Sequence, residues 1–404
     1  MVDAVDSKPT AGDSVRVQVS LPAHKTLNEQ SIPLGVLHCC WGEDLKVSAG
    51  THSVEWVARA GPRGVLVRRR QDELLAKRFS RHRKTGLTFR TSFCMIACGH
   101  EPSGSEAYLK KTNRALERLK AGWADNRLIC VGLDPDAKRM PKELQAGAPE
   151  QAVPYIWEHC MRSVQASHGR ALAYKPNLAF FEGWGHAGII QLKMLIEYLR
   201  GREKDVPIIL DFKRGDIGAT NAGYVREAVE YFQVDGVTLH PYLGMDATAP
   251  FLELSDMLLF FLCKTSNPGS GEFQNRHVAL EPQEAVDLGL MEGATVPLYH
   301  LVAHRIASHW NKNGNCGLVV GATYPQELAQ VRLLAGDAPI LAPGVGTQGG
   351  DLEATVRGGI IAGKGAQGLL INIGSGIMYA ENPPMAFATY DRAAQAALTA
   401  SIPR

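Results

Sequence analysis

From residue 106 onward, short apolar runs alternate with longer stretches in which apolar residues recur every three or four positions. Short runs of this kind are typical of buried strands, and the longer pattern is typical of amphipathic helices. The runs that we interpret as strands are 128–133, 171–175, 207–212, 236–240, 258–264, 317–321, 339–342 and 368–371. The helical patterns between them include 155–167, 188–199, 223–232 and 325–334.

Eight predicted strands, each followed by a crossover helix, indicate an α/β protein with a (β/α)8 (TIM) barrel of about 250 residues. A doubly wound open sheet has the same alternation and is the alternative. We favour the barrel because the charged and glycine-rich clusters all fall at the C-terminal ends of predicted strands, where such barrels build active sites. The pattern 107–121 predicts an amphipathic helix leading into the barrel, and the insert 266–295 is long enough to cover the site.

Residues 1–105 have a different character from the barrel at 106–404, and we interpret them as an N-terminal extension that is disordered or poorly structured. The stretch 63–90 is strongly basic, which indicates either an anionic-surface or nucleic-acid patch or a solvated extension. A third interpretation is that Met95 is the natural start. The clusters 38–40 and 94–100 contain zinc-ligand residue types, but their spacing is irregular for a structural site.

Composition narrows the class of protein. A net charge of +2 predicts no strong attraction to nucleic acid. The sequence contains no run of 18 apolar residues, so we expect no membrane span. The N-terminus lacks the pattern of a secretory signal, and the eight cysteines lack framework spacing. We therefore expect a reduced, cytoplasmic enzyme, with Cys130 and Cys263 as small buried hydrophobes in strands.

The most informative segment is 206–220 (VPIILDFKRGDIGAT), in which an apolar strand runs into a cluster of charges. Strand side chains alternate, so Asp211 and Lys213 point to the same face. Asp216 lies just past the strand, and Thr220 follows four residues later. Two carboxylates close together raise each other's pKa, and an ammonium between them allows both to stay ionised. This arrangement predicts an electrostatic site; a surface salt-bridge cluster is the simpler alternative.

The string DFKRGDIGAT at 211–220 resembles the signature of orotidine 5'-phosphate decarboxylases. Further matches occur in the same order over about 128–379, and the whole looks closest to the bacterial subfamily with longer inserts. They lie at 131–136, 174–182, 235–244, 263–270, 318–323 and 341–350. The resemblance implies conversion of orotidine 5'-phosphate (OMP) to UMP and CO2 in pyrimidine biosynthesis, with no metal and no cofactor.

Decarboxylation of OMP leaves negative charge at C6 of the pyrimidine with no electron sink beside it, so the protein must supply a fixed positive charge and a proton. The resemblance implies that Lys213 is the proton donor to C6. It places Asp211 beside the substrate carboxylate and pairs Lys175 with Asp211 and a ribose hydroxyl. Asp134 would bind the ribose.

The resemblance also implies a homodimer with shared active sites, in which Asp216 and Thr220 reach into the neighbouring subunit's site. Ser266 matches the serine that hydrogen-bonds the pyrimidine ring. The loop that begins at Pro343 would cradle the phosphate with backbone N–H groups, and Gln348 matches a phosphate-contacting glutamine.

The sequence departs from the family pattern after the eighth strand, where Ser375 stands at the position of a phosphate-binding arginine. A serine cannot replace a bidentate guanidinium. Lys364 is a candidate substitute cation, provided that its loop folds over the site. The departure leaves two alternatives open: a catalytically weakened barrel kept for binding, or a related sugar-phosphate decarboxylase or aldolase that uses Mg²⁺.

Overall fold

A computed structural model of the 404-residue chain describes residues 113–139, 142, 149–346 and 348–401, together with four short strands nearer the N-terminus. The chain divides into two compact units, Met1–Ser103 and Gly104–Arg404. No helix in these described parts is long and apolar enough to cross a membrane.

The first unit contains a four-stranded sheet in the order β1-β2-β3-β4. Its first two strands are parallel, and the other neighbours are antiparallel. The strands are β1 (Val15–Gln18), β2 (Leu45–Ser48), β3 (Trp56–Gly61) and β4 (Gly64–Arg69). The predicted zinc-ligand types at 38–40 and 94–100, Met95 and the basic residues from 70 to 90 lie outside the described residues.

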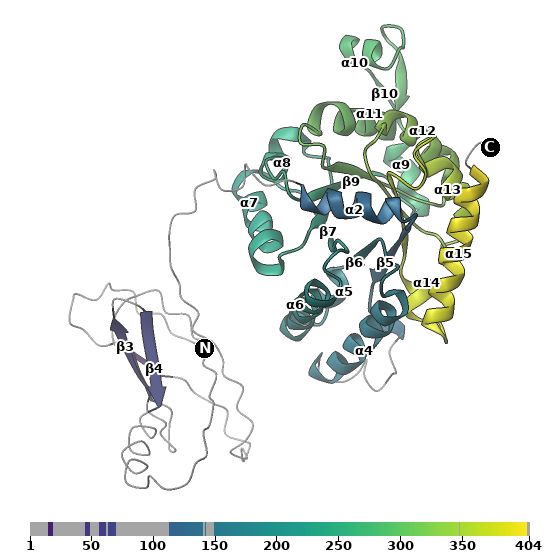
Figure 1. Cartoon of the computed structure of the whole chain (residues 1–404). Coiled ribbons are helices and arrows are strands. Elements are labelled where there is room, and N and C mark those ends of the chain that lie inside the picture. Colours follow the sequence, from purple (N-terminus) through teal and green to yellow (C-terminus); the bar gives the residue numbers. More distant parts are fainter. Residues whose placement is uncertain are drawn as a thin grey trace, which may run out of the picture. The chain divides into compact units, whose positions relative to one another are not determined.

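The second unit is built around eight parallel strands in the order β6-β5-β14-β13-β12-β9-β8-β7 (Figure 1). Parallel bridges from Tyr174 to Ile208 and from Asn177 to Asp211 join the two outer strands, β6 and β7, and so close the ring. The predicted barrel is confirmed, and the open doubly wound sheet is wrong. The strands are β5 (Ile129–Leu133), β6 (Ala173–Pro176), β7 (Ile209–Arg214), β8 (Gly236–Leu239), β9 (Leu258–Lys264), β12 (Cys316–Val320), β13 (Ile340–Pro343) and β14 (Leu369–Ile373).

Helices surround this ring and bury its outer face (Figure 1). Two of them continue into π-helical turns, η3 (Glu227–Phe232) after α7 and η5 (Ile306–Trp310) after α11. As predicted, Cys130 and Cys263 are buried thiols of the core. The main helices are α4 (Pro149–Ser167), α6 (Gly185–Arg202), α7 (Gly218–Arg226), α8 (Gly244–Leu252), α11 (Leu298–Arg305), α12 (Pro325–Ala335), α13 (Leu352–Gly359) and α15 (Pro383–Ser401).

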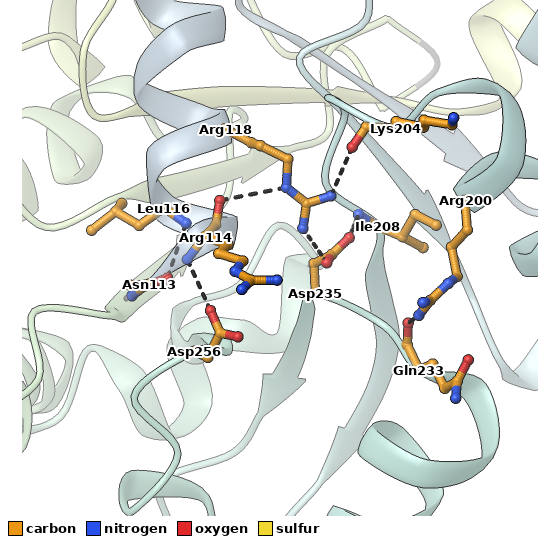
Figure 2. A network of polar contacts seen from close by, with 10 residues as sticks. All are labelled: Asn113, Arg114, Leu116, Arg118, Arg200, Lys204, Ile208, Gln233, Asp235 and Asp256. Atoms are coloured by element: carbon orange, nitrogen blue, oxygen red, sulfur yellow. Dashed lines mark hydrogen bonds and ion pairs between the residues drawn. The ribbon is translucent and has the colours of Figure 1, made fainter. Parts of the chain in front are cut away.

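The predicted leading helix corresponds to α2 (Arg114–Ala124), which packs at the N-terminal end of the barrel. The indole N–H of Trp123 donates to the carbonyl of Leu369 at 2.8 Å. Arg118 forms an ion pair with Asp235 and donates to the carbonyl of Lys204, as Figure 2 shows. A cavity of about 650 Å³ lies beside these residues. This end is opposite the C-terminal ends of the strands, so the cavity is separate from the predicted site.

The insert after β9 forms a small module of its own. It contains an antiparallel hairpin of β10 (His277–Ala279) and β11 (Thr295–Pro297), with α10 (Pro282–Asp287) between them. Figure 1 shows α10 and β10 standing out from the ring of helices. These elements therefore do not form the cover over the barrel mouth that the length of the insert suggested.

Candidate active site

The charged residues predicted from the sequence meet at the C-terminal end of the barrel strands. Lys175 lies near the end of β6, Asp211 and Lys213 are the third and fifth residues of β7, and Asp134 follows directly after β5. Parallel strands end on the same side of a barrel, so residues far apart in the chain share one mouth.

Asp211 lies at the centre of a tight ionic network. Its Oδ2 accepts a hydrogen bond from the Lys175 ammonium at 2.7 Å, and its Oδ1 accepts one from the Lys213 ammonium at 2.5 Å. The hydroxyl of Thr238, in β8, donates to the same Oδ1 at 2.9 Å. Within one chain the arrangement is thus one carboxylate between two ammonium groups.

The backbone of β7 departs from a regular strand at this point. Lys213 has a positive φ of 45°, which is uncommon for a residue other than glycine. The N–H groups of Phe212 and Lys213 both donate to the Thr238 hydroxyl, at 3.1 and 3.0 Å, and the register with β8 shifts here. A bulge of this kind re-aims a side chain, and strained backbone often occurs at functional sites.

Burial and charge act against each other on the Asp211 carboxyl. Burial acts to raise its pKa, but Lys175 and Lys213 outweigh this and hold the pKa well below its usual range. Burial likewise acts to lower the pKa of Lys175, and the adjacent Asp211 and Asp134 raise it above its usual range. Asp211 and Lys175 therefore stay charged at neutral pH although their side chains are only 10% and 4% exposed.

The Lys213 side chain is 49% exposed, in contrast to its two partners. The buried Asp211 carboxylate thus holds the Lys213 ammonium group, which stays accessible from the barrel mouth. A fixed cation of this kind can stabilise negative charge that develops on a bound molecule, and it can also donate a proton.

Two buried polar atoms near this network have no hydrogen-bond partner among the described residues: Oδ1 of Asp134 and Oδ1 of Asn372 in β14. Two glycines bring them close together. A Cβ at Gly374 would lie 3.1 Å from Asp134 Oδ2, and a Cβ at Gly132 would lie 3.3 Å from Asn372 Oδ1. Unpaired buried acceptors are rare in folded proteins, and hydroxyl groups of a ligand would satisfy them.

Burial raises the pKa of Asp134, while Lys175 acts to lower it and Asp211 acts to raise it. The charges of Lys175 and Asp211 therefore act on the Asp134 carboxyl, which is consistent with Asp134 being part of the candidate active site.

The glycine-rich loop after β13 brings two further predicted residues together. Gly344 has a φ of 109°, and a Cβ there would lie 2.9 Å from Gln348 Oε1 and 3.4 Å from the Cβ of Ser266. A residue with a side chain at position 344 would be strained and would push these groups apart. Ser266 and Gln348 therefore flank Gly344, and Pro343 precedes it at the end of β13.

Ser375 is the first residue of the short helix α14 (Ser375–Met378), directly after Gly374. Its position at the C-terminal end of β14 is where a phosphate-binding group was expected. Lys364 is not in this region. Its ammonium pairs with both carboxylate oxygens of Asp337, at 2.7 and 2.6 Å, between loops that precede β14 and β13. The idea that Lys364 replaces a missing arginine is wrong, because these loops lie at the opposite end of the barrel.

Asp216 and Thr220 are not joined to the network by any hydrogen bond or ion pair among the described residues. The Asp216 Oδ1 accepts from the N–H of Ile217 at 2.7 Å, and its own N–H donates to Asn221 at 3.0 Å. Thr220 is exposed on α7. The partly exposed Asp216 and the exposed Thr220 can therefore both contact a second molecule that packs beside the barrel mouth.

Sequence reasoning missed Thr238, Asn372 and Lys264. Thr238 lies within the matched segment 235–244 but was not singled out there, because the roles of Thr238 and Asn372 depend on which strand lies beside each of them. Lys264 ends β9 and is buried, with its ammonium donating to Ser270 Oγ and lying 3.9 Å from the centre of the Tyr324 ring. The signal for Lys264 was its place at a strand end.

A (β/α)8 barrel with two lysines fixed on one buried aspartate at its mouth is the electrostatic kind of site that a lyase can use. The model of the "Orotidine 5'-phosphate decarboxylase / HUMPS family" matches residues 127–390. The chain belongs to this family.

Relatives and solved structures agree with this assignment. The chain is 43% identical to "Orotidine 5'-phosphate decarboxylase" of Azoarcus sp. over 65% of this chain and 88% of that protein. It is also 43% identical to the Bordetella pertussis protein of the same name over 66% and 89%. The structure of Leishmania donovani OMP decarboxylase matches with a TM-score of 0.59 and 34% identity, covering 70% of this chain and 98% of that one. A putative decarboxylase from Toxoplasma gondii matches with a TM-score of 0.61 and 33% identity, over 71% and 96%.

Proposed function

We propose that this chain converts OMP to UMP and CO2, with Lys213 as the proton donor to C6. The observation that carries the proposal is the pair of ammonium groups fixed on one buried carboxylate, Asp211, at 2.7 and 2.5 Å. An uncatalysed decarboxylation at C6 has no internal electron sink, so a fixed positive charge is the group that the reaction needs.

In the proposed reaction the bond between C6 and the carboxylate carbon breaks, and CO2 leaves. The electron pair stays on C6, beside the Lys213 ammonium. A proton then passes from Lys213 Nζ to C6, which gives UMP and leaves a neutral amine that takes a proton from water. No oxidant, metal or cofactor is needed for this balance, and we expect none.

Asp211 would lie beside the substrate carboxylate and disfavour its bound ground state, because like charges in a buried site repel. It also fixes the position of Lys213, which spares the site from reorganising as charge develops. Lys175 keeps Asp211 ionised. We assign the two unpaired acceptors, Asp134 and Asn372, to ribose hydroxyl groups.

For the rest of the nucleotide we propose Ser266 as a partner of the pyrimidine ring. The loop of Pro343 and Gln348 would receive the phosphate through backbone N–H groups, since its glycines allow close approach of the backbone. Ser375 would offer a neutral hydrogen bond where the resemblance to the family implies an arginine.

We expect Ser375→Arg to lower the KM for OMP. Hydrogen bonds to charged groups contribute about 1.5–3 kcal/mol each, so a bidentate arginine would lower KM on the order of 100-fold. Steady-state kinetics of the two proteins tests this, with Ser401→Arg on the last turn of α15 as a control for added charge. An unchanged KM would show that another group already binds the phosphate.

We further propose a homodimer in which Asp216 and Thr220 complete the partner subunit's site. What supports this is their position: both lie beside the barrel mouth, and neither contacts the network of its own chain. In this arrangement a second carboxylate reaches Lys213 from across the interface.

Mixing subunits tests the shared site. Lys213→Ala and Asp216→Ala should each be nearly inactive, whereas a mixed dimer has one site that carries both defects and one intact site. After mixing and exchange, we expect activity to return to about a quarter of the wild-type value, because half of the dimers are mixed and each has one intact site. No recovery, with exchange confirmed by mass spectrometry, would rule out the shared site.

We propose a cytoplasmic location from the composition alone, and no role in nucleic-acid binding. The alternative activity, a Mg²⁺-dependent sugar-phosphate decarboxylase, requires a metal-bound enediolate. A strict requirement for added Mg²⁺ would favour that reaction over the decarboxylation of OMP.

A further inference from the structure

A cluster of metal-ligand side chains lies away from the barrel mouth, where the insert meets the helix that follows it. His304 in α11, His309 in η5 and Asp287 at the end of α10 have ligand atoms that all lie within 4.8 Å of one another. None of these residues contacts the catalytic network, so the cluster is independent of the proposed function.

The π-helical turn explains how two histidines five residues apart come to share a face. In a regular α-helix such residues are separated by about 140° around the axis. The wider π turn over Ile306–Trp310 reduces this angle, and turns of this kind often occur at functional sites. The two imidazole rings lie edge to face, with centroids 5.3 Å apart.

His304 provides a second, independent observation. It is only 5% exposed, and its Nε2 has no hydrogen-bond partner among the described residues. The Asp287 Oδ2 lies 3.7 Å from this nitrogen, too far for a hydrogen bond. On the other side of the ring, Ser308 Oγ lies 3.4 Å from Nδ1 and orients the imidazole. The unpaired nitrogen is thus aimed at Asp287 and His309.

The distances between the ligand atoms of this cluster suit a small metal ion. A tetrahedral ion with bonds of about 2.0–2.2 Å holds its ligand atoms about 3.3–3.6 Å apart, close to the observed 3.7 Å between His304 and Asp287. His309 and Asp287 are exposed and can adjust their side chains. Gln283 donates to the other Asp287 oxygen at 2.8 Å, as groups around metal ligands commonly do. Two imidazoles and one carboxylate favour Zn²⁺-like ions over Mg²⁺ or Ca²⁺.

We propose that His304, His309 and Asp287 bind a divalent transition-metal ion of the Zn²⁺ class and that this ion fastens α10 to the α11–η5 helix. The insert has a small core of its own, with Leu280, Ala285 and Val296 as its buried residues. Small cores commonly need an additional cross-link such as a metal ion. The Arg305–Glu284 ion pair joins the same two elements, which shows that they form one interface.

Calorimetric titration of the metal-free full-length protein with Zn²⁺ tests the site. Residues 1–105 also contain cysteines and histidines, which are metal-ligand residue types, so the number of bound ions is compared between variants. We expect His309→Ala to bind one ion fewer than the wild type, and Asp287→Asn to bind that ion at least tenfold more weakly. His277→Ala removes an exposed histidine of the same module and should match the wild type. Equal numbers and affinities in all four proteins would overturn the proposal.

Amide hydrogen exchange tests the cross-link separately. Added Zn²⁺ should slow exchange in α10 and in the β10–β11 hairpin of the wild type and of His277→Ala, but not of His309→Ala. If Zn²⁺ leaves the exchange rates of this module unchanged in the wild type, the proposed cross-link is overturned. Neither readout measures decarboxylation, so failure here and failure of the proposed activity are distinguishable.

Discussion

Lys213→Ala is expected to abolish turnover of OMP while leaving the barrel folded. The substitution removes both the fixed cation beside C6 and the proton donor. General acid catalysis contributes about 10²–10⁴-fold and a preorganised electrostatic group about 10²–10³-fold, so we expect kcat to fall by at least about 10⁴-fold. The measurement is the loss of OMP absorbance with enzyme expressed in a host that lacks its own decarboxylase.

Lys193→Ala is the matched control for this experiment. Lys193 lies on α6, pairs with Glu197 at 3.4 Å and has no contact with Asp211, so its loss should leave kcat unchanged. Circular dichroism of both variants should match that of the wild type. Appreciable turnover by a folded Lys213→Ala protein would remove Lys213 from its assigned role.

Asp211→Asn should impair both activity and stability. The substitution leaves the Lys175 ammonium buried without its counter-charge, since the Lys175 side chain is only 4% exposed. Breaking a buried ion pair costs about 3–5 kcal/mol. We therefore expect the free energy of unfolding to fall by about that amount in urea denaturation, together with a loss of turnover because Lys213 is no longer held in place.

A second variant separates the two effects. Lys175→Met combined with Asp211→Asn removes the buried charge and should recover most of the stability, because replacing a whole buried pair is often neutral. It should not recover turnover. A double variant as unstable as Asp211→Asn would show that the pair is not the source of the lost stability.

The pKa shifts give the pH range of this stabilisation. The lowered pKa of Asp211 means that its contribution is present above its unfolded pKa of about 3.9 and is lost as the pH falls below that value. The raised pKa of Lys175 means that its contribution is complete below about pH 10 and is lost as the pH rises further. The stability difference between wild type and Asp211→Asn should therefore be constant between about pH 5 and 9 and shrink outside that range.

The barrel could be predicted from the sequence because each strand and helix is a local pattern. The predicted strand 258–264 matches β9 without a shift, and the boundaries of the other strands differ by at most two residues. Alternation along one strand predicted that Asp211 and Lys213 share a face, and in the structure a bulge at Lys213 also contributes to the direction of its side chain. Lys175 and Asp211 meet because β6 and β7 close the ring, and the resemblance to a family supplied that pairing rather than the pattern itself.

Other features depend on neighbours that the sequence does not reveal. The positive φ of Lys213 arises from a bulge held by Thr238 on the adjacent strand. Lys364 was considered as a substitute cation, but its loop precedes β14 at the opposite end of the barrel, where Lys364 pairs with Asp337. The insert appeared long enough to cover the site, but it folds on its own small core. In each case a tertiary contact decided the outcome.

The most direct test of the central claim is the decarboxylation of OMP by the purified protein in EDTA. The proposed mechanism uses no metal ion at the reacting centre, so we predict rapid conversion to UMP and CO2 that EDTA does not reduce, even if an ion is removed from the His304 cluster. A folded protein that fails to convert OMP in EDTA but does so when Mg²⁺ or Zn²⁺ is restored would contradict the claim that Lys213 and Asp211 supply the catalytic electrostatics alone.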